Sequence, residues 1–148
     1  MREILFRGQT RKHGEKVRMG DGQKLPGHWV YGGVLQGIGD HSIIYGGDKI
    51  EDTSEGFDKW CVHTDTLGQF TGLVDKNGKM IFEGDILSTE NGTFSNTGMG
   101  HILLYKGMWT SFYGQDAIGR DCFDELHTVC GSREVIGNIY DNPELLEV

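Results

Sequence analysis

The stretch GQFTGLVDKNGKMIFEGDIL, residues 68–87, decides the fold class of this chain. Its first part, residues 69–75, is rich in apolar and β-branched side chains, which is typical of a strand. Asn77 and Gly78 follow, a pair that favours positive φ at both positions, as a type I′ turn requires. The chain then runs back through KMIFEG, and Glu83-Gly84-Asp85 permits a sharp bend before a third strand. The stretch therefore predicts a tight hairpin and a kinked strand, the corner that small barrels need.

Glycine dominates the composition, with 24 Gly and only two Pro among 148 residues. No Gly-X-Y period occurs, which excludes collagen. Three Trp, seven Phe and five Tyr supply too much apolar surface for a disordered chain. Many short strands joined by glycine turns remain, so the predicted fold is mainly β. The length fits one domain over residues 1–148, with β-subregions at residues 1–66 and 67–148.

Other strand-like runs flank this stretch. HILLYKG and MWTSFYG, residues 101–114, predict a second hairpin with its turn at Lys106 and Gly107. Long polar, Gly-rich loops are expected before residue 28 and over residues 91–100. At most short helices are expected, near 121–127 and near 143–147, and residues 115–130 could form either a helix or another strand. The remaining predicted strands are Arg2–Gly8, His28–Gly37, His41–Gly47, Lys59–Thr64 and residues 135–140.

The net charge of −8 disfavours non-specific binding to nucleic acid, because an acidic globule repels phosphate. The segment Arg7–Arg18 is locally basic, and we interpret it as a solvated loop. Aromatic residues on predicted strands leave single-stranded nucleic-acid binding as an alternative, although such residues more often fill a core or an oligomer interface. These residues are Trp29, Tyr31, Phe70, Trp109, Phe112 and Tyr113.

The three cysteines are odd in number and contain no C-x-x-C pair. Charged residues interrupt the apolar residues at the N-terminus, unlike in a signal peptide. No apolar run approaches the ~20 residues of a membrane helix. The sequence therefore predicts a reduced, cytoplasmic protein without a membrane segment.

Candidate catalytic and metal-binding residues are few. Cys61 and His63 would share one face of a strand, and a thiol-dependent or hydrolytic enzyme could use that pair or Cys122 with His127. Zinc could combine these four with Cys130, but the spacing fits no common zinc module. Reduced, buried thiols are the default interpretation. Asp75 begins an apparent calcium loop, which fails because its twelfth position is Ile86. No phosphate-binding loop occurs, and no cofactor, metal site or catalytic residue is predicted.

Three segments, which follow one another along the chain, resemble the YopX protein family of phages and prophages. The first is MREILFRG with residues 29–32, and the second comprises Gly68–Leu73, Asp75–Lys79 and residues 81–86. The third is residues 134–146, EVIGNIYDNPELL. Residues 11–26 and 91–133 are not diagnostic. The resemblance implies a small, largely β protein with an SH3-like barrel element and a tendency to self-associate, and it implies no activity or catalytic residue.

The leading hypothesis is therefore a homo-oligomeric phage accessory protein that binds a host or phage protein and has no catalytic function. The exposed edges of a small β-domain must be covered or paired, and copies of the chain could pair in this way. A small thiol-dependent or hydrolytic enzyme and a single-stranded nucleic-acid binder remain the alternatives.

Overall fold

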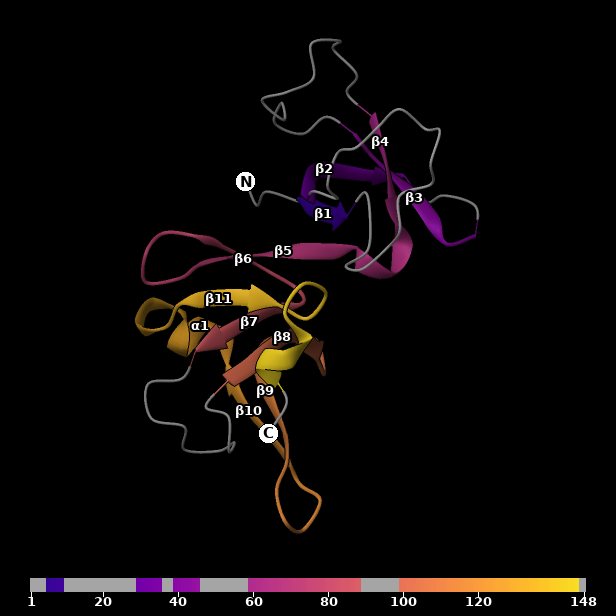
Figure 1. Cartoon of the computed structure of the whole chain (residues 1–148). Helices are drawn as coiled ribbons and strands as arrows, with labels where there is room; N and C mark the ends of the chain where they lie inside the picture. Colours follow the sequence, from indigo (N-terminus) through magenta and orange to yellow (C-terminus); the bar gives the residue numbers. More distant parts are fainter. Residues whose placement is uncertain (1–4, 10–28, 36–38, 46–58, 89–98, 147–148) are drawn as a thin grey trace. The chain divides into compact units, whose positions relative to one another are not determined.

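The computed structural model describes residues 5–9, 29–35, 39–45, 59–88 and 99–146. They form two compact units, Glu3–Gln69 and Phe70–Val148, called here the N-terminal and the C-terminal unit (Figure 1). Both consist mainly of antiparallel strands, so the mainly β prediction is confirmed. The SH3-like barrel and the single domain remain predictions. The loop expected before residue 28 lies outside the described residues. So do residues 91–98 of the loop expected over 91–100, but its last two residues, Met99 and Gly100, begin a strand instead.

The N-terminal unit is a sheet with the order β4-β3-β2-β1, in which the start of β5 pairs with β1. Its core consists of Val30, Ile44 and Val62, with Leu67 packed against them. A 3-10 turn at Thr64–Thr66 follows the last strand. The four strands are β1 (Phe6–Gln9), β2 (Trp29–Leu35), β3 (His41–Tyr45) and β4 (Lys59–His63).

The C-terminal unit contains a five-stranded sheet with the order β10-β9-β8-β7-β11. A hairpin of β5 (Gly68–Val74) and β6 (Met80–Phe82) precedes it. Two 3-10 turns occur, η2 (Cys130–Ser132) and η3 (Pro143–Leu146). The other elements are β7 (Asp85–Ser88), β8 (Met99–Tyr105), β9 (Met108–Gln115), β10 (Asp121–Glu125), α1 (Leu126–Val129) and β11 (Val135–Asn138).

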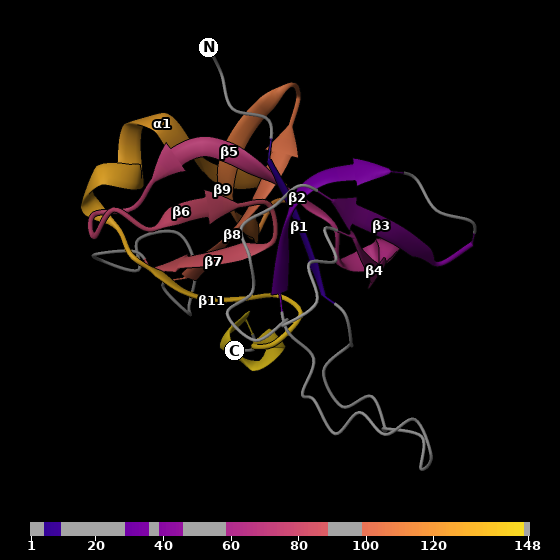
Figure 2. The ribbon, with the colours of Figure 1, turned by 90° about the horizontal axis from the view of Figure 1, so that it is seen from above.

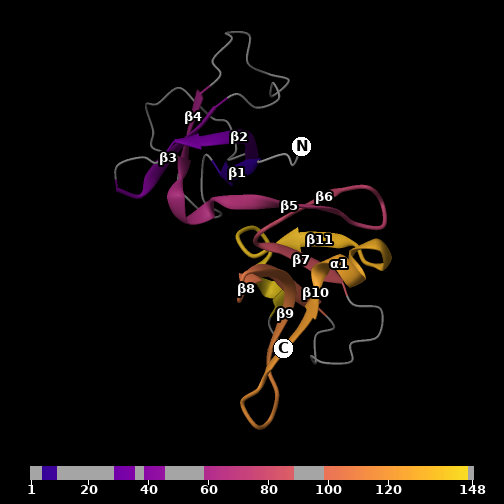
Figure 3. The same ribbon diagram turned by 180° about the vertical axis from the view of Figure 1, so that it is seen from behind.

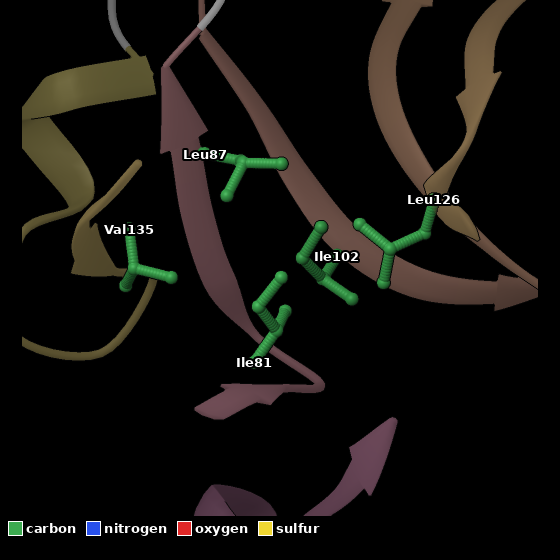
Figure 4. Close-up of a cluster of buried hydrophobic side chains, with 5 residues drawn as sticks. All are labelled: Ile81, Leu87, Ile102, Leu126 and Val135. Carbon is green, nitrogen blue, oxygen red and sulfur yellow. The ribbon is translucent and has the colours of Figure 1, made fainter. Parts of the chain in front are cut away.

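The core of the C-terminal unit lies on one face of this sheet. Five fully or nearly fully buried side chains from β6, β7, β8, α1 and β11 converge there (Figure 4). Leu73, Trp109 and Cys130 pack around them. The five are Ile81, Leu87, Ile102, Leu126 and Val135.

The hairpin at DKNGK is present, but its predicted turn type is wrong. Gly78 has a φ of +81°, whereas Asn77 is not among the residues with positive φ. The N–H of Gly78 donates to the carbonyl of Asp75 at 3.0 Å, and the N–H of Asp75 donates to the carbonyl of Lys79 at 2.8 Å. This pattern is a type I turn followed by a left-handed glycine. The Asp75 carboxylate selects it, because Oδ1 accepts the N–H groups of both Asn77 and Lys79.

The same turn occurs a second time, at DAIGR between β9 and β10. Gly119 also has a φ of +81°, and its N–H donates to the carbonyl of Asp116 at 3.1 Å. Asp116 Oδ1 accepts the N–H groups of Ile118 and Arg120. Both turns therefore share the pattern Asp-x-x-Gly-Lys/Arg.

The type I′ geometry occurs instead between β8 and β9, where the predicted turn at Lys106 and Gly107 is confirmed. Lys106 has a φ of +50° and Gly107 a φ of +80°. Tyr105 pairs with Met108 on either side of these two residues.

Of the helix and the strand left open for residues 115–130, both occur: residues 121–125 form β10, and the short helix α1 begins only at Leu126. The Asp116 turn reverses the chain, and Phe123 then pairs with Phe112 across the hairpin. The helical spacing of Phe123, Leu126 and His127 therefore spans the end of a strand and the start of α1. The short helix expected near 143–147 is confirmed as η3.

The EGD bend is held by residues far away in the sequence. Gly84 has a φ of +90°, its N–H donates to the carbonyl of Ile102, and its carbonyl accepts the N–H of Ile139. The predicted strand over residues 135–140 ends at Asn138, because Asn138 Oδ1 accepts the N–H groups of Tyr140 and Asp141 and starts a turn.

Candidate interaction surface

The candidate cysteine and histidine residues do not assemble into a site. On β4, Cys61 is exposed and His63 is buried. On β10, Cys122 Sγ donates to the carbonyl of Arg120. The His127 imidazole lies 3.5 Å from the carboxylate of Glu125. Cys130 packs against the core. In the part of the chain that the structure describes, no three His, Cys, Asp or Glu side chains gather closely enough to hold a metal ion.

The most distinctive surface lies on the face of β8, β9 and β10 that is opposite the core. His101 pairs with Phe112, and Phe112 pairs with Phe123, so the three side chains share this face, and strand alternation adds Tyr105. Ring centroids are 5.9 Å apart for His101 and Phe112, 6.0 Å for Tyr105 and Phe112, and 4.9 Å for Tyr105 and Phe123. We call these four side chains the aromatic stripe.

The aromatic stripe is only partly covered. Three of its members are half-buried, and Phe123 is 36% exposed. Partial burial lowers the pKa of His101 and favours its neutral form. The Tyr105 hydroxyl donates to Asp121 Oδ2 at 2.7 Å, and this bond raises the pKa of Tyr105 and lowers that of Asp121. The stripe is thus a row of neutral rings with a carboxylate at its end.

A polar cluster fixes the core side of the same strands. Tyr113 on β9 donates to Asp124 Oδ2 on β10 at 2.5 Å. Arg133 donates to Asp124 Oδ2 through Nη2 at 2.8 Å and to the Tyr113 hydroxyl through Nη1. Burial and the bond to Asp124 raise the pKa of Tyr113, so it stays a protonated donor at neutral pH. The cluster therefore ties β9, β10 and the segment before β11 together.

Replacing Arg133 with methionine is expected to destabilise the protein by about 1–3 kcal/mol, because Asp124 would keep its charge in a mostly buried position without its cation. Urea unfolding at neutral pH measures this free energy. Lys76→Met is the matched control, since Lys76 and Glu134 form an ion pair that is 4.0 Å long and 48% exposed on both sides. That pair contributes less than about 1 kcal/mol. Equal losses in the two variants would contradict a structural role for the cluster.

The β9–β10 hairpin projects beyond the other strands of the C-terminal unit (Figures 1 and 3). Its tip carries Ile118, which is 74% exposed. The outermost strand, β10, carries three acidic residues out of five, and Asp121 and Glu125 are exposed. The C-terminal unit as a whole has twelve acidic and five basic residues.

The aromatic residues considered for nucleic-acid stacking do not share one face in the C-terminal unit. Phe70 is buried, with its ring centroid 5.5 Å from that of Phe82, and Trp109 packs against the core. Tyr113 belongs to the polar cluster. Of these four only Phe112 lies on the aromatic stripe, and the acidic surroundings oppose phosphate.

Sequence reasoning missed His101, Tyr105 and Phe123 as surface residues, and it missed the cluster of Tyr113, Asp124 and Arg133. The recurrence of the Asp-x-x-Gly-Lys/Arg pattern at residues 116–120 was a signal that could have found the β9–β10 hairpin and its register.

None of the helices in the described ranges is long and apolar enough to cross a membrane. A model of the YopX protein family matches residues 27–147. No curated protein matches the chain. Among solved structures, the chain is similar to the crystal structure of protein EF1440 from Enterococcus faecalis, with 24% identity and a TM-score of 0.41 over 98% of this chain and 99% of that one.

Proposed function

The chain belongs to the YopX protein family, and on that premise we propose that it is a phage accessory protein of the host cytoplasm that associates with copies of itself, binds a protein partner and has no catalytic function. The observation that carries this proposal is the aromatic stripe on β8, β9 and β10.

The second and third segments that carry the family resemblance hold turns of the fold in place, and this supports a non-catalytic function. Asp75 accepts three backbone N–H groups, and the N–H of Lys76 donates to the carbonyl of Arg133 at 2.9 Å. The turn at residues 75–79 and the start of β11 therefore lie side by side in the C-terminal unit (Figure 2). Gly84 bonds to the turn after β11. These side chains and backbone groups stabilise turns, and none of them is left to bind a substrate.

The aromatic stripe supports association because partly exposed aromatic rings are typical of interface centres. An aromatic side chain covers about 150–250 Å² when fully buried. About a third of that area, or less, remains exposed on each ring here. A stable interface needs about 800 Å² from each partner. The stripe is thus the centre of the proposed interface, and its half-buried neighbours Leu103 and Met108 supply further area.

Native mass spectrometry of Phe112→Lys tests this proposal. Wild-type protein is expected at a multiple of 16.5 kDa at micromolar concentration. Phe112→Lys is expected as a monomer, because the interface would bury an unpaired charge. Leu104→Lys is the matched control, since Leu104 is 53% exposed on the adjacent strand and its side chain lies on the opposite face.

Circular dichroism checks whether both variants are folded. A monomeric wild-type protein would contradict self-association. If Phe112→Lys stayed oligomeric while folded, the stripe would not be the interface.

A further inference from the structure

The outer edge of β10 has no paired strand in the part of the C-terminal sheet that the structure describes. β10 is one of the two edge strands of this sheet and pairs with β9 on one side. No strand among the described residues pairs with its other side. An edge strand presents a row of backbone N–H and carbonyl groups, which an extended chain can pair with.

The charges along β10 disfavour a second copy of β10 at this edge. A symmetric antiparallel pair centred on Phe123 would place Asp121 of each copy directly opposite Glu125 of the other. Like charges at directly opposed positions destabilise strand pairing. The side chains of Asp121 and Glu125 are both exposed, and both have partners within the same chain. Tyr105 and Gln115 donate to Asp121. The exposed His127 lies 3.5 Å from Glu125.

The same charges favour a basic strand. Asp121, Phe123 and Glu125 alternate along β10 and therefore face the same side as the aromatic stripe. Asp124 faces the other side, where Arg133 already compensates its charge. A strand paired with β10 would meet two carboxylates that flank one partly exposed aromatic ring.

We propose that the outer edge of β10 binds an extended basic segment of another protein, which adds to the sheet as a sixth strand. The segment carries Lys or Arg opposite Asp121 and Glu125 and an apolar residue opposite Phe123. Backbone hydrogen bonds supply affinity, and the two cations supply specificity. The exposed Ile118 at the hairpin tip extends the contact beyond β10. This inference specifies the partner of the proposed function and rests on it.

A fluorescent peptide tests the inference. Its core is lysine-threonine-valine-threonine-lysine, flanked by glycine-serine pairs, and its binding to the full chain is measured by fluorescence anisotropy at low salt. The same peptide with glutamates in place of the lysines is expected to bind at least ~10-fold more weakly. A version with alternate N-methylated amides is expected to lose binding, because it cannot donate backbone hydrogen bonds. Hydrogen exchange is expected to slow in β10 when the lysine peptide binds.

A charge-reversal variant tests the position of the peptide. Asp121→Lys with Glu125→Lys is expected to reverse the preference, so that the glutamate peptide binds more tightly. The control Glu134→Lys with Glu144→Lys changes the net charge equally at two exposed residues outside β10, and it is expected to keep the preference for lysine.

Three results would overturn the inference: equal binding of the lysine and glutamate peptides, undiminished binding of the N-methylated peptide, or protection of β10 by a second copy without peptide. The native mass without peptide reports separately on self-association. An oligomer that binds no lysine peptide would refute this inference alone, and a monomer that binds it would refute only the self-association.

Discussion

Asp75→Ala is expected to lower the free energy of unfolding by about 3 kcal/mol or more, because hydrogen bonds to a charged group contribute about 1.5–3 kcal/mol each. The Asp75 side chain is 4% exposed and accepts three backbone N–H groups. Oδ1 accepts those of Asn77 at 2.8 Å and Lys79 at 2.9 Å, and Oδ2 accepts that of Val135 at 2.9 Å. Water can reach the two turn amides after the substitution, so most of the loss comes from the buried Val135 amide.

Asp116→Ala is the matched control for Asp75→Ala. Asp116 caps the same kind of turn, but its turn is at the tip of a projecting hairpin, and its third bond is to the exposed side chain of Arg120. Water can replace all three bonds, so we expect a loss of about 1 kcal/mol or less. Urea unfolding at pH 7 measures both variants. Equal losses would show that the bond between Asp75 and Val135 contributes nothing beyond the turn.

The hydrogen bonds of Asp75 also predict that the free energy of unfolding depends on pH in the acid range. Burial alone would raise the pKa of Asp75, but the N–H groups of Val135, Lys79 and Asn77 together hold it below the ordinary value of 3.8. The contribution to stability is therefore present above about pH 4 and is lost as the pH falls through the lowered pKa. Asp75→Asn should flatten this part of the curve of unfolding free energy against pH. If the unfolding free energy of Asp75→Asn decreased below about pH 4 as steeply as that of the wild-type protein, Asp75 would not be the group responsible.

Gly84→Val is expected to destabilise the protein by about 3 kcal/mol or more, through two effects that add. A β-branched residue resists the φ of +90° at this position. A Cβ atom at Gly84 would also lie 3.0 Å from Tyr140 Cε2, which is closer than carbon atoms pack. Moving Tyr140 would disturb the bond from the N–H of Ile139 to the Gly84 carbonyl.

Gly78→Val separates the two effects, because its φ of +81° is similar and a Cβ atom there would meet nothing within 4 Å. We expect a loss of somewhat more than about 1 kcal/mol from backbone strain alone. Thermal unfolding of both variants gives the comparison. A loss at Gly84 no larger than that at Gly78 would mean that the contact with Tyr140 adds nothing.

The sequence predicted the local parts of the fold because their determinants are local. Gly78, Gly84 and Gly107 mark the turns correctly, since a left-handed φ is a property of the residue itself. Asn77-Gly78 alone predicts a type I′ turn, but the Asp75 carboxylate selects a different hydrogen-bond pattern, which the pair does not reveal. The spacing of Phe123, Leu126 and His127 is helical only because it crosses the boundary between β10 and α1.

The candidate site was less predictable because it depends on strand register. Tyr105, Phe112 and Phe123 come from three strands, and only the pairing of those strands places their rings in one row. Tyr113 and Arg133 are twenty residues apart and meet because the segment before β11 lies on the core side of β9 and β10. No local pattern in the sequence states which face of β9 points to the core, so the aromatic stripe and the polar cluster could not be told apart.

The bond between Asp75 and Val135 joins residues 60 positions apart, and this separation sets an order of folding. The β5–β6, β8–β9 and β9–β10 hairpins close through short turns and can form on the scale of microseconds. The Asp75 carboxylate and the Gly84 carbonyl, in contrast, receive their distant donors only when residues 135–139 arrive. Docking of β11 is thus the nonlocal and slow step. During synthesis the core of the C-terminal unit stays incomplete until β11 has left the ribosome, because Val135 of that strand belongs to the core. Until then the earlier hairpins can form only without it.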